Sequence, residues 1–429
     1  MNKKWATLLS AAWAVMAAAP AVAQTIVIHA GTLIAEPGKP PLKNQSIIIE
    51  GGKIKAVVDG FVSGDEVVDL SNKHVLPGLI DMHTHVSGPS HVDTENPRGW
   101  VTDQEMQRQS ITVLRAVPVV KMILHHGFTT IRNLADPARV TYDLRDAIAA
   151  GQVEGPRMLV SEPQFHTAGN TLMASAIHAR SEIAALLTYP GECNSVDDCR
   201  RAVRQEVERG ADVIKIRLSD LTAGDPRVQA VEYQEELNAM VETAHRMGRT
   251  VAVHTAGVDR VTMMAIEAGP DSIEHGPQSE MTLRAMKRKG ISFTPTISPY
   301  IFYADAIRAA GSLRDFAGES RTSVALAKKI GVRILFGTDL TPETAPKQAM
   351  EFRELVAAGL TPTEAIEAAT INAAAVLHME DQIGSIGAGK EADIIAVDRD
   401  PLQDVSALEN VSFVMKGGVV IKGGMSVHP

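Results

Sequence analysis

The sequence predicts an α/β fold in which a (β/α)8 barrel is inserted into a small β-sandwich domain built from both chain ends. The first observation is that residues 76–375 alternate short apolar strands with amphipathic helices, which is the rhythm of such a barrel. The second is that residues 24–75 and 376–429 contain mainly strand and tight-turn patterns. The third is that histidine, lysine and aspartate stand at the ends of barrel strands, where barrel active sites lie.

At 429 residues, with 45% hydrophobic and 22% charged residues, the chain can bury a large core and has the composition of a globular protein. Aromatic residues contribute only 4%, which suits parallel strands rich in valine and isoleucine. The net charge is −9, and no cluster of lysine and arginine interrupts it. Nucleic acids and anionic membrane surfaces are therefore disfavoured as partners, and a small-molecule substrate is expected.

Residues 1–23 predict a secretory signal peptide. Two lysines precede an apolar run that is too short for a membrane anchor, and an A-x-A-type cleavage site ends at Ala23. We therefore expect a periplasmic or secreted protein, cleaved near Ala23. In an oxidising compartment, Cys193 and Cys199, which flank a short polar loop, are expected to form a local disulfide.

Both ends of the chain have the pattern of short strands. The expected strands are 25–28, 45–50 and 53–58 near the N-terminus, and 381–386, 392–397, 411–416 and 419–422 near the C-terminus. Glycine pairs mark hairpin turns between 45–50 and 53–58 and between the last two strands. Because the N-terminal strands have no neighbours of their own kind, we expect the two ends to share one domain.

The central region supplies the barrel elements. The expected strands are 79–85, 129–133, 158–161, 213–217, 250–254, 272–274, 292–294 and 334–337, and the expected helices include 111–125, 233–247, 260–267 and 323–329. A doubly wound open sheet is the alternative, but no G-x-G-x-x-G motif follows the first strand.

The first barrel strand ends in two histidines, His83 and His85, with one residue between them. Side chains alternate along a strand, so both imidazoles face the same side. Two imidazoles on one face can form a pair of metal ligands. Two unrelated histidines at a strand end are the alternative for this motif taken alone.

Four later strand positions carry matching chemistry. Lys215 lies inside an apolar strand, where a bare ammonium would be costly. His254, His275 and Asp339 each stand at the end of a further strand. Taken singly, such a histidine is more often a core or surface residue, and such an aspartate often caps a helix. Together with the first pair, they predict a metal centre.

These residues resemble those of the amidohydrolase superfamily of metal-dependent hydrolases. The motifs that carry the resemblance are residues 77–85, Lys215, His254, His275, the Gly-Thr-Asp sequence ending at Asp339, and the tail 383–393 followed by Asp400-Pro401. They span nearly the whole mature sequence. The resemblance implies two divalent ions, usually zinc, bridged by a lysine that CO₂ has carboxylated.

Carried over residue by residue, the resemblance implies that His83, His85 and Asp339 hold one ion. His254 and His275 would hold the other, and Lys215 would bridge them as a carbamate. It further implies attack by a metal-bridging hydroxide, with Asp339 passing the proton to the leaving amine. An apolar pocket lowers a lysine pKa and so favours the neutral amine that carboxylation requires.

Within the superfamily, the strand around Lys215 and residues 253–257 are most similar to the imidazolonepropionase-related branch. That branch includes exported Xaa-Pro and other dipeptidases and an ochratoxin-hydrolysing amidohydrolase, which release a C-terminal amino acid. We therefore expect a dipeptide, Xaa-Pro or N-acyl amino acid substrate such as ochratoxin A. Imidazolonepropionases use one metal without the bridging lysine, so Lys215 argues against that activity.

A substrate of this kind carries a carboxylate that the protein must bind. Arg217 lies two residues past Lys215, so strand alternation aims it toward the same mouth, and its fork suits a carboxylate. An outward salt-bridged arginine is the alternative. His166 and Tyr233 are further candidates, although the sequence around His166 departs from the Gly-Gly-His pattern expected of the family.

Other functions fit the same fold. A lactonase or phosphotriesterase could use the same metal centre, and a cyclic amide hydrolase fits the motifs less well. A non-catalytic binding protein is disfavoured because the ligand set is complete. The resemblance also implies a homo-oligomer, as large as an octamer in some relatives.

Overall fold

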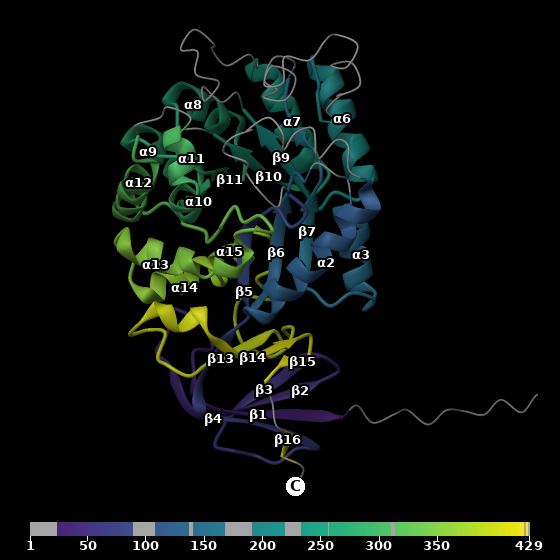
Figure 1. Cartoon of the computed structure of the whole chain (residues 1–429), viewed down its shortest axis with the longest axis vertical. Coiled ribbons are helices and arrows are strands. Elements are labelled where there is room, and N and C mark those ends of the chain that lie inside the picture. The colour runs from purple at the N-terminus through teal and green to yellow at the C-terminus, as the bar shows by residue number, and fades with distance from the viewer. Residues whose placement is uncertain are drawn as a thin grey trace, which may run out of the picture.

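The computed structural model describes residues 24–88, 108–136, 140–167, 191–218, 233–255, 257–309, 314–423 and 426–427. A sheet domain lies at one end of the molecule, and a larger part with helices around parallel strands lies at the other (Figure 1). The signal peptide expected at residues 1–23 lies outside the described residues. Among the described helices, none has both the length and the apolar character needed to cross a bilayer.

The sheet domain contains strands from both ends of the chain. Its strands are β1 (Thr25–Leu33), β2 (Leu42–Glu50), β3 (Lys53–Asp59), β4 (Glu66–Pro77), β13 (Ile394–Val397), β14 (Val411–Lys416), β15 (Val419–Lys422) and β16 (Ser426–Val427). They pair in the order β15-β14-β13-β4-β1-β2-β3, and β16 pairs with β4. Ile47 and Ile49 of β2 enter the same core, as the two-residue period of a strand requires.

Three expectations for this domain need correction. β4, which runs parallel to β1 and antiparallel to β13, was not predicted, yet it joins the two chain ends. Residues 381–386 form turns and bends instead of a strand, because Gly384 has a φ of 85°. The strands pair as one continuous sheet and not as the two sheets of a sandwich.

The parallel strands of the larger part form two sheets. β5 (Leu79–Thr84), β6 (Phe128–Leu134) and β7 (Arg157–Ser161) make a three-stranded sheet. β8 (Gln164–Phe165), β9 (Val213–Arg217), β10 (Thr250–His254), β11 (Ser272–Glu274) and β12 (Ser292–Thr294) make a five-stranded sheet. Almost every residue of these strands is buried, including polar residues such as Thr130 and Asn133 of β6.

The mixed α/β class is confirmed, but the described residues form no closed ring of eight strands. The last expected strand, 334–337, is irregular. Ile334 makes a single parallel bridge to Phe293 of β12, and Leu340 makes another to Thr84 of β5. Residues 334–340, here called the irregular segment, therefore link an edge of the five-stranded sheet to an edge of the three-stranded sheet.

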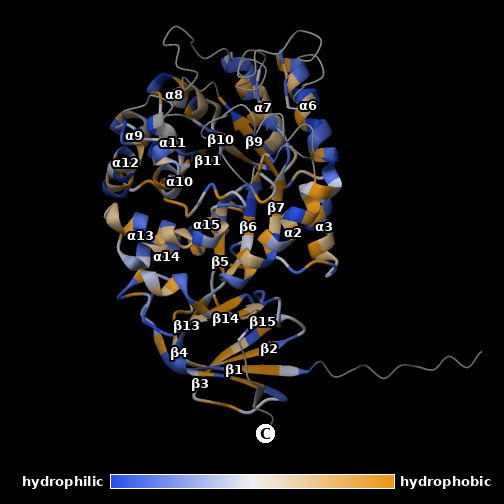
Figure 2. Ribbon diagram, viewed as in Figure 1, coloured by the Kyte–Doolittle hydropathy of each residue, from blue (hydrophilic) through white to orange (hydrophobic). Residues whose placement is uncertain are grey.

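Helices pack around the strands. They are α2 (Gln109–His125), α3 (Thr141–Ala149), α6 (Val196–Glu208), α7 (Gln234–Arg246), α8 (Asp259–Ala268), α9 (Glu280–Lys289), α10 (Ile297–Phe302), α11 (Ala304–Ala309), α12 (Phe316–Ile330), α13 (Met350–Ala357), α14 (Pro362–Ala368) and α15 (Ile371–Val376). The four helices expected from the sequence correspond to α2, α7, α8 and α12. Figure 2 shows hydrophobic residues along the strands and hydrophilic residues on outer helices such as α6 and α9.

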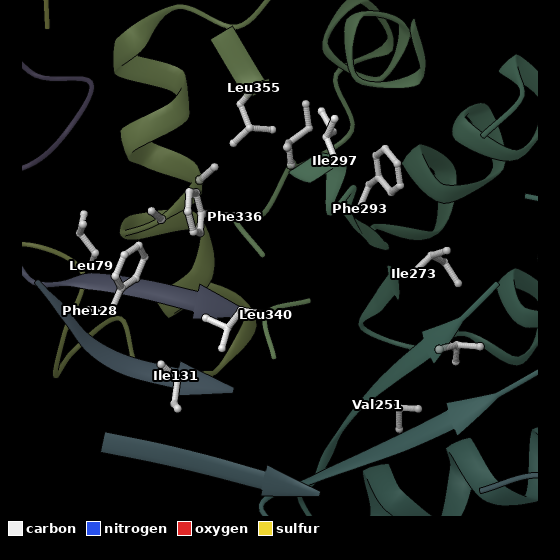
Figure 3. Packing of buried hydrophobic residues seen from close by; sticks show 14 of the residues in the cluster. Leu79, Phe128, Ile131, Val251, Ile273, Phe293, Ile297, Phe336, Leu340 and Leu355 are labelled. Carbon is white, nitrogen blue, oxygen red and sulfur yellow. The ribbon is translucent and has the colours of Figure 1, made fainter. Parts of the chain in front are cut away.

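α12 begins at Phe316, well before the expected start at residue 323, because the Asp315 side chain accepts the Gly318 N–H and caps the helix. One large apolar core fills the space between strands and helices, and Figure 3 shows part of it. Within it, the ring centroids of Phe128 and Phe336 lie 5.4 Å apart, and those of Phe336 and Phe352 lie 4.3 Å apart. This packing supports the base of β5.

An ion pair between a partly exposed arginine and a buried aspartate joins the sheet domain to the larger part. Arg157 of β7 donates from Nη1 to Oδ2 of Asp393 at 2.7 Å. The other oxygen of Asp393 accepts the Gly417 N–H at 2.8 Å, and its carbonyl accepts the Gly78 N–H at 2.9 Å. The Asp393 side chain is only 5% exposed, so its acceptor oxygens depend mainly on these protein partners.

We expect Asp393→Ala to lower the free energy of unfolding by about 1–3 kcal/mol, because Arg157 and the Gly417 N–H lose their acceptor. Urea denaturation of the mature protein measures the change. Glu280→Ala is the control, since it removes an exposed pair with Arg284 and should cost less than about 1 kcal/mol. Equal losses in the two variants would contradict a stabilising role for Asp393.

Candidate metal centre

Three of the expected metal ligands form a tight cluster at the end of β5. Nε2 of His85 lies 3.1 Å from Oδ1 of Asp339, and Nε2 of His83 lies 3.4 Å from the same oxygen. One ligand atom from each residue lies within 4.8 Å of the others. The Asp339 N–H donates to the His83 carbonyl at 2.8 Å, which holds the irregular segment beside β5.

The other three expected ligands surround this cluster. Nζ of Lys215 lies 3.2 Å from Nε2 of His83. The ring centroid of His275 lies 4.4 Å from that of His83 and 4.6 Å from that of His254. The C-terminal ends of β5, β9, β10 and β11 and the irregular segment therefore place all the predicted ligands around one point.

Two of these residues have a left-handed backbone. His275 has a φ of 66° and Asp339 has a φ of 50°, a region that residues other than glycine seldom occupy. Each such residue costs on the order of 1–3 kcal/mol and persists only where its surroundings hold it. The conformation turns both side chains into the cluster directly after an extended segment.

Burial leaves most of the cluster histidines neutral. It lowers the pKa of His254 and His275 well below the ordinary value and that of His83 to about 4. A neutral imidazole offers a lone pair to a metal. His85 differs: burial lowers its pKa, but hydrogen bonds with Asp136 and Asp339 outweigh that effect and raise it to about 9.

The pKa values of Lys215 and Asp339 are also shifted in the direction that favours metal binding. Burial lowers the pKa of Lys215 to about 8, against the opposing charges of Glu274 and Asp339. Its amine is thus closer to the neutral form that carboxylation requires. Burial works against ionisation of Asp339, but its electrostatic interaction with the His275 ring and its hydrogen bond with His85 hold its pKa well below the ordinary value.

Three buried residues that the sequence did not single out orient the histidines. Oε2 of Glu274 lies 2.8 Å from Nδ1 of His83, and Arg132 donates to the other Glu274 oxygen at 2.8 Å. Oδ1 of Asp136 lies 3.1 Å from Nδ1 of His85. With Nδ1 engaged, each imidazole presents Nε2 to the centre. The sequence did contain a signal for two of them, because Glu274 and Arg132 are charged residues inside the otherwise buried strands β11 and β6.

Asp81 is a further buried carboxyl that the sequence reasoning missed. It accepts the Thr338 hydroxyl at 2.6 Å, the Gln348 amide at 2.8 Å and the His83 N–H at 3.0 Å. Burial raises its pKa to about 6. These contacts lock the residue before Asp339 onto β5.

The candidate substrate-binding residues differ in placement. His166 is 2% exposed, and its Nδ1 lies 3.0 Å from the Gln164 carbonyl. The charge of Arg217 acts on both His166 and His254, lowering the pKa of each beyond the larger effect of burial. Tyr233 is 70% exposed at the start of α7, and among the described residues it makes no hydrogen bond to the cluster.

The expected disulfide lies next to His166. Cys193 and Cys199 are bonded, and both are fully buried. The Cys193 N–H donates to the His166 carbonyl at 3.0 Å, and the His166 N–H donates to the Gly191 carbonyl at 3.2 Å. The bond therefore ties the start of α6 to the backbone that carries His166.

The sequence model of the amidohydrolase family matches residues 74–422. The chain belongs to this family. An ochratoxinase of Aspergillus niger is 30% identical over 437 residues, covering 94% of this chain and 87% of that protein. An imidazolonepropionase of Fusobacterium nucleatum is 27% identical, covering 83% of this chain and 85% of its own. A crystal structure of a Xaa-Pro dipeptidase with methionine in its active site superposes with a TM-score of 0.81 at 32% identity, covering 93% of this chain and all of that one.

The amidohydrolase is therefore a hydrolytic enzyme of a family that generally binds a divalent metal. Its own residues fit such an ion. Nε2 of His254 is buried without a hydrogen-bond partner among the described residues, a costly state that a metal bond would relieve. Imidazole nitrogen and carboxylate oxygen are also the donors that zinc accepts.

Zinc binding to the metal-free amidohydrolase should tighten as the pH rises toward 9. His85 keeps a proton below its pKa of about 9, and a metal ion must displace that proton. Equilibrium titrations against a competing chelator, without bicarbonate, measure the dependence. The apparent affinity should rise by up to ~10-fold per pH unit from His85 alone and level off above its pKa.

Asp136→Asn should move that plateau to lower pH, because it weakens a hydrogen bond that raises the pKa of His85. Asp197→Asn on the exposed face of α6 is the control and should leave the profile unchanged. An affinity that does not vary with pH would contradict the protonated state of His85.

Proposed function

We propose that this amidohydrolase cleaves an amide bond to release the C-terminal amino acid of a dipeptide, an Xaa-Pro peptide or an N-acyl amino acid such as ochratoxin A. The observation that carries the proposal is the buried amine of Lys215, 3.2 Å from Nε2 of His83 within the ligand cluster. The similarity to proteins named ochratoxinase and Xaa-Pro dipeptidase supports the substrate class.

In this proposal the cluster binds two divalent ions, with zinc the best match to its nitrogen and carboxylate donors. His83, His85 and Asp339 would hold one ion, and His254 and His275 the other. Lys215, once carboxylated, would bridge them. When bound, such ions lower the pKa of water toward neutrality and polarise a carbonyl oxygen.

A side chain of the protein transfers the proton. The Asp339 carboxylate, ionised because of its low pKa, accepts the proton of the attacking water and delivers it to the leaving nitrogen. A C–O bond forms, the C–N bond breaks, and the amino acid leaves as a free amine. Glu274 and Arg132 keep His83 in the tautomer that faces the centre.

We propose that Arg217 binds the substrate carboxylate. It ends β9 two residues after Lys215, and its charge acts on both His254 and His166. A guanidinium can hold a carboxylate through two parallel hydrogen bonds. We also propose export after removal of residues 1–23, which the Cys193–Cys199 disulfide supports because such bonds persist in oxidising compartments.

The mature protein, supplied with zinc and bicarbonate, should release free amino acid from a panel of dipeptides and N-acyl amino acids that includes ochratoxin A. Lys215→Ala should lower the rate by at least about a hundredfold, since it removes a ligand and not merely its support. Lys416→Ala is the control. Lys416 is a partly buried lysine of β14 in the sheet domain, where it donates to the Gly155 carbonyl and is not part of the ligand cluster.

A chelator should abolish amino acid release from the wild type, and added zinc should restore it. Turnover of lactones or phosphotriesters without turnover of any amide would contradict the proposed substrate class and favour the alternative chemistry on the same centre.

Arg217→Ala should raise KM for a dipeptide by roughly 10–100-fold, with a smaller change in kcat, because a charge-assisted contact to the carboxylate is lost. The matched substrate is the same dipeptide with its C-terminus amidated. The wild type should discriminate against the amide by a similar factor, and the variant should not discriminate. Unchanged discrimination in the variant would show that another group binds the carboxylate.

A further inference from the structure

Glu351 on α13 is a buried carboxyl that the proposed reaction does not use. Its side chain has no exposed surface. Oε1 accepts the Ile297 N–H at 2.9 Å, and Oε2 accepts the Ser298 N–H at 2.7 Å. Burial raises its pKa to about 7, because the interior disfavours the charged carboxylate. Keeping this group in the core therefore costs stability.

The two amides that Glu351 binds open the short helix α10. The first N–H groups of a helix have no acceptor within the helix, so a buried start needs an outside partner. Glu351 supplies that partner and engages the two amides directly after Thr296. It therefore fixes where α10 begins and how Thr296 enters it.

Thr296 has a strained backbone, with φ 46° and ψ 63°. A β-branched residue is seldom left-handed, and such strain persists only where neighbouring contacts impose it. The Thr296 side chain is 1% exposed, and its Oγ1 lies 2.7 Å from Nδ1 of His275. A further contact supports the same geometry, since Tyr300 of α10 accepts the Gly276 N–H at 3.2 Å.

Among the described residues, no carboxylate bonds to Nδ1 of His275, unlike His83 and His85, whose Nδ1 atoms face Glu274 and Asp136. Its orientation instead depends on a single hydroxyl, which depends on the start of α10. We propose that Glu351 is a positioning residue that directs Nε2 of His275 into the metal centre by holding the strained Thr296 turn. This inference rests on the proposed two-ion centre, in which His275 and His254 hold the second ion.

Glu351→Gln tests the proposal at nearly constant volume, because the amide NH₂ would face a backbone N–H and one of the two hydrogen bonds is lost. The zinc- and bicarbonate-loaded protein is titrated with a chelator, and the retained ions are counted by mass spectrometry. We expect the affinity for one ion to fall by about 10–100-fold while the other ion is held as in the wild type.

Glu354→Gln is the matched control, because Glu354 lies on the same helix and pairs with Arg321 outside the centre. Thr296→Val replaces the hydroxyl with a methyl group and leaves the Glu351 contacts intact, so it tests the contact with His275 even where Glu351→Gln folds poorly. It should weaken the same ion, Thr296→Ser should retain it, and the double variant Glu351→Gln/Thr296→Val should lose no more than either single variant.

Two results would overturn the inference. One is that Thr296→Val and Glu351→Gln hold both ions as tightly as Glu354→Gln. The other is that they lose both ions in parallel with a fall in melting temperature, as a purely structural role requires. A wild-type protein that binds only one ion would instead contradict the proposed two-ion centre, so the two failures are distinguishable.

Discussion

Burial of a lysine among four histidines is the constraint on which the rest of the site depends. An ammonium in such a pocket is destabilised unless carboxylates surround it. Glu274 and Asp339 supply those carboxylates and act on Lys215 from opposite elements, β11 and the irregular segment. The same two carboxylates contact His83, so one set of charges satisfies the lysine and orients a histidine.

The backbone around the centre carries strain to meet this constraint. His275, Thr296 and Asp339 all adopt a left-handed conformation directly after an extended segment. In each case a buried hydrogen bond from another element holds the residue, as with Glu351 at the Thr296 turn and Asp81 at the residue before Asp339. The polar core of this enzyme is therefore built around the orientation of a few nitrogen atoms.

The irregular segment also shapes the fold. The segment turns at Asp339, where φ is 50°, and bridges β12 to β5 at two single points. The sheet domain supports this arrangement at the start of β5 and β7, because β4 leads through Gly78 into β5 and Asp393 binds Arg157 of β7. The position of His83 thus depends on contacts between segments far apart in the sequence.

The sequence by itself determined the family, the strands that carry the predicted ligands and the shared face of His83 and His85, because these follow from local periodicity and short motifs. It also placed Lys215 and Arg217 on one face of β9. Only the tertiary structure decided the supporting groups, such as Glu274 and Glu351, because their partners lie far away in the chain and no local pattern distinguishes them from other acidic residues. Tyr233 proved exposed at the start of α7, and residues 334–337 make only one bridge, from Ile334 to Phe293. Residues 381–386 are not a strand, because the left-handed turn at Gly384 overrode the extended structure that their apolar residues favour.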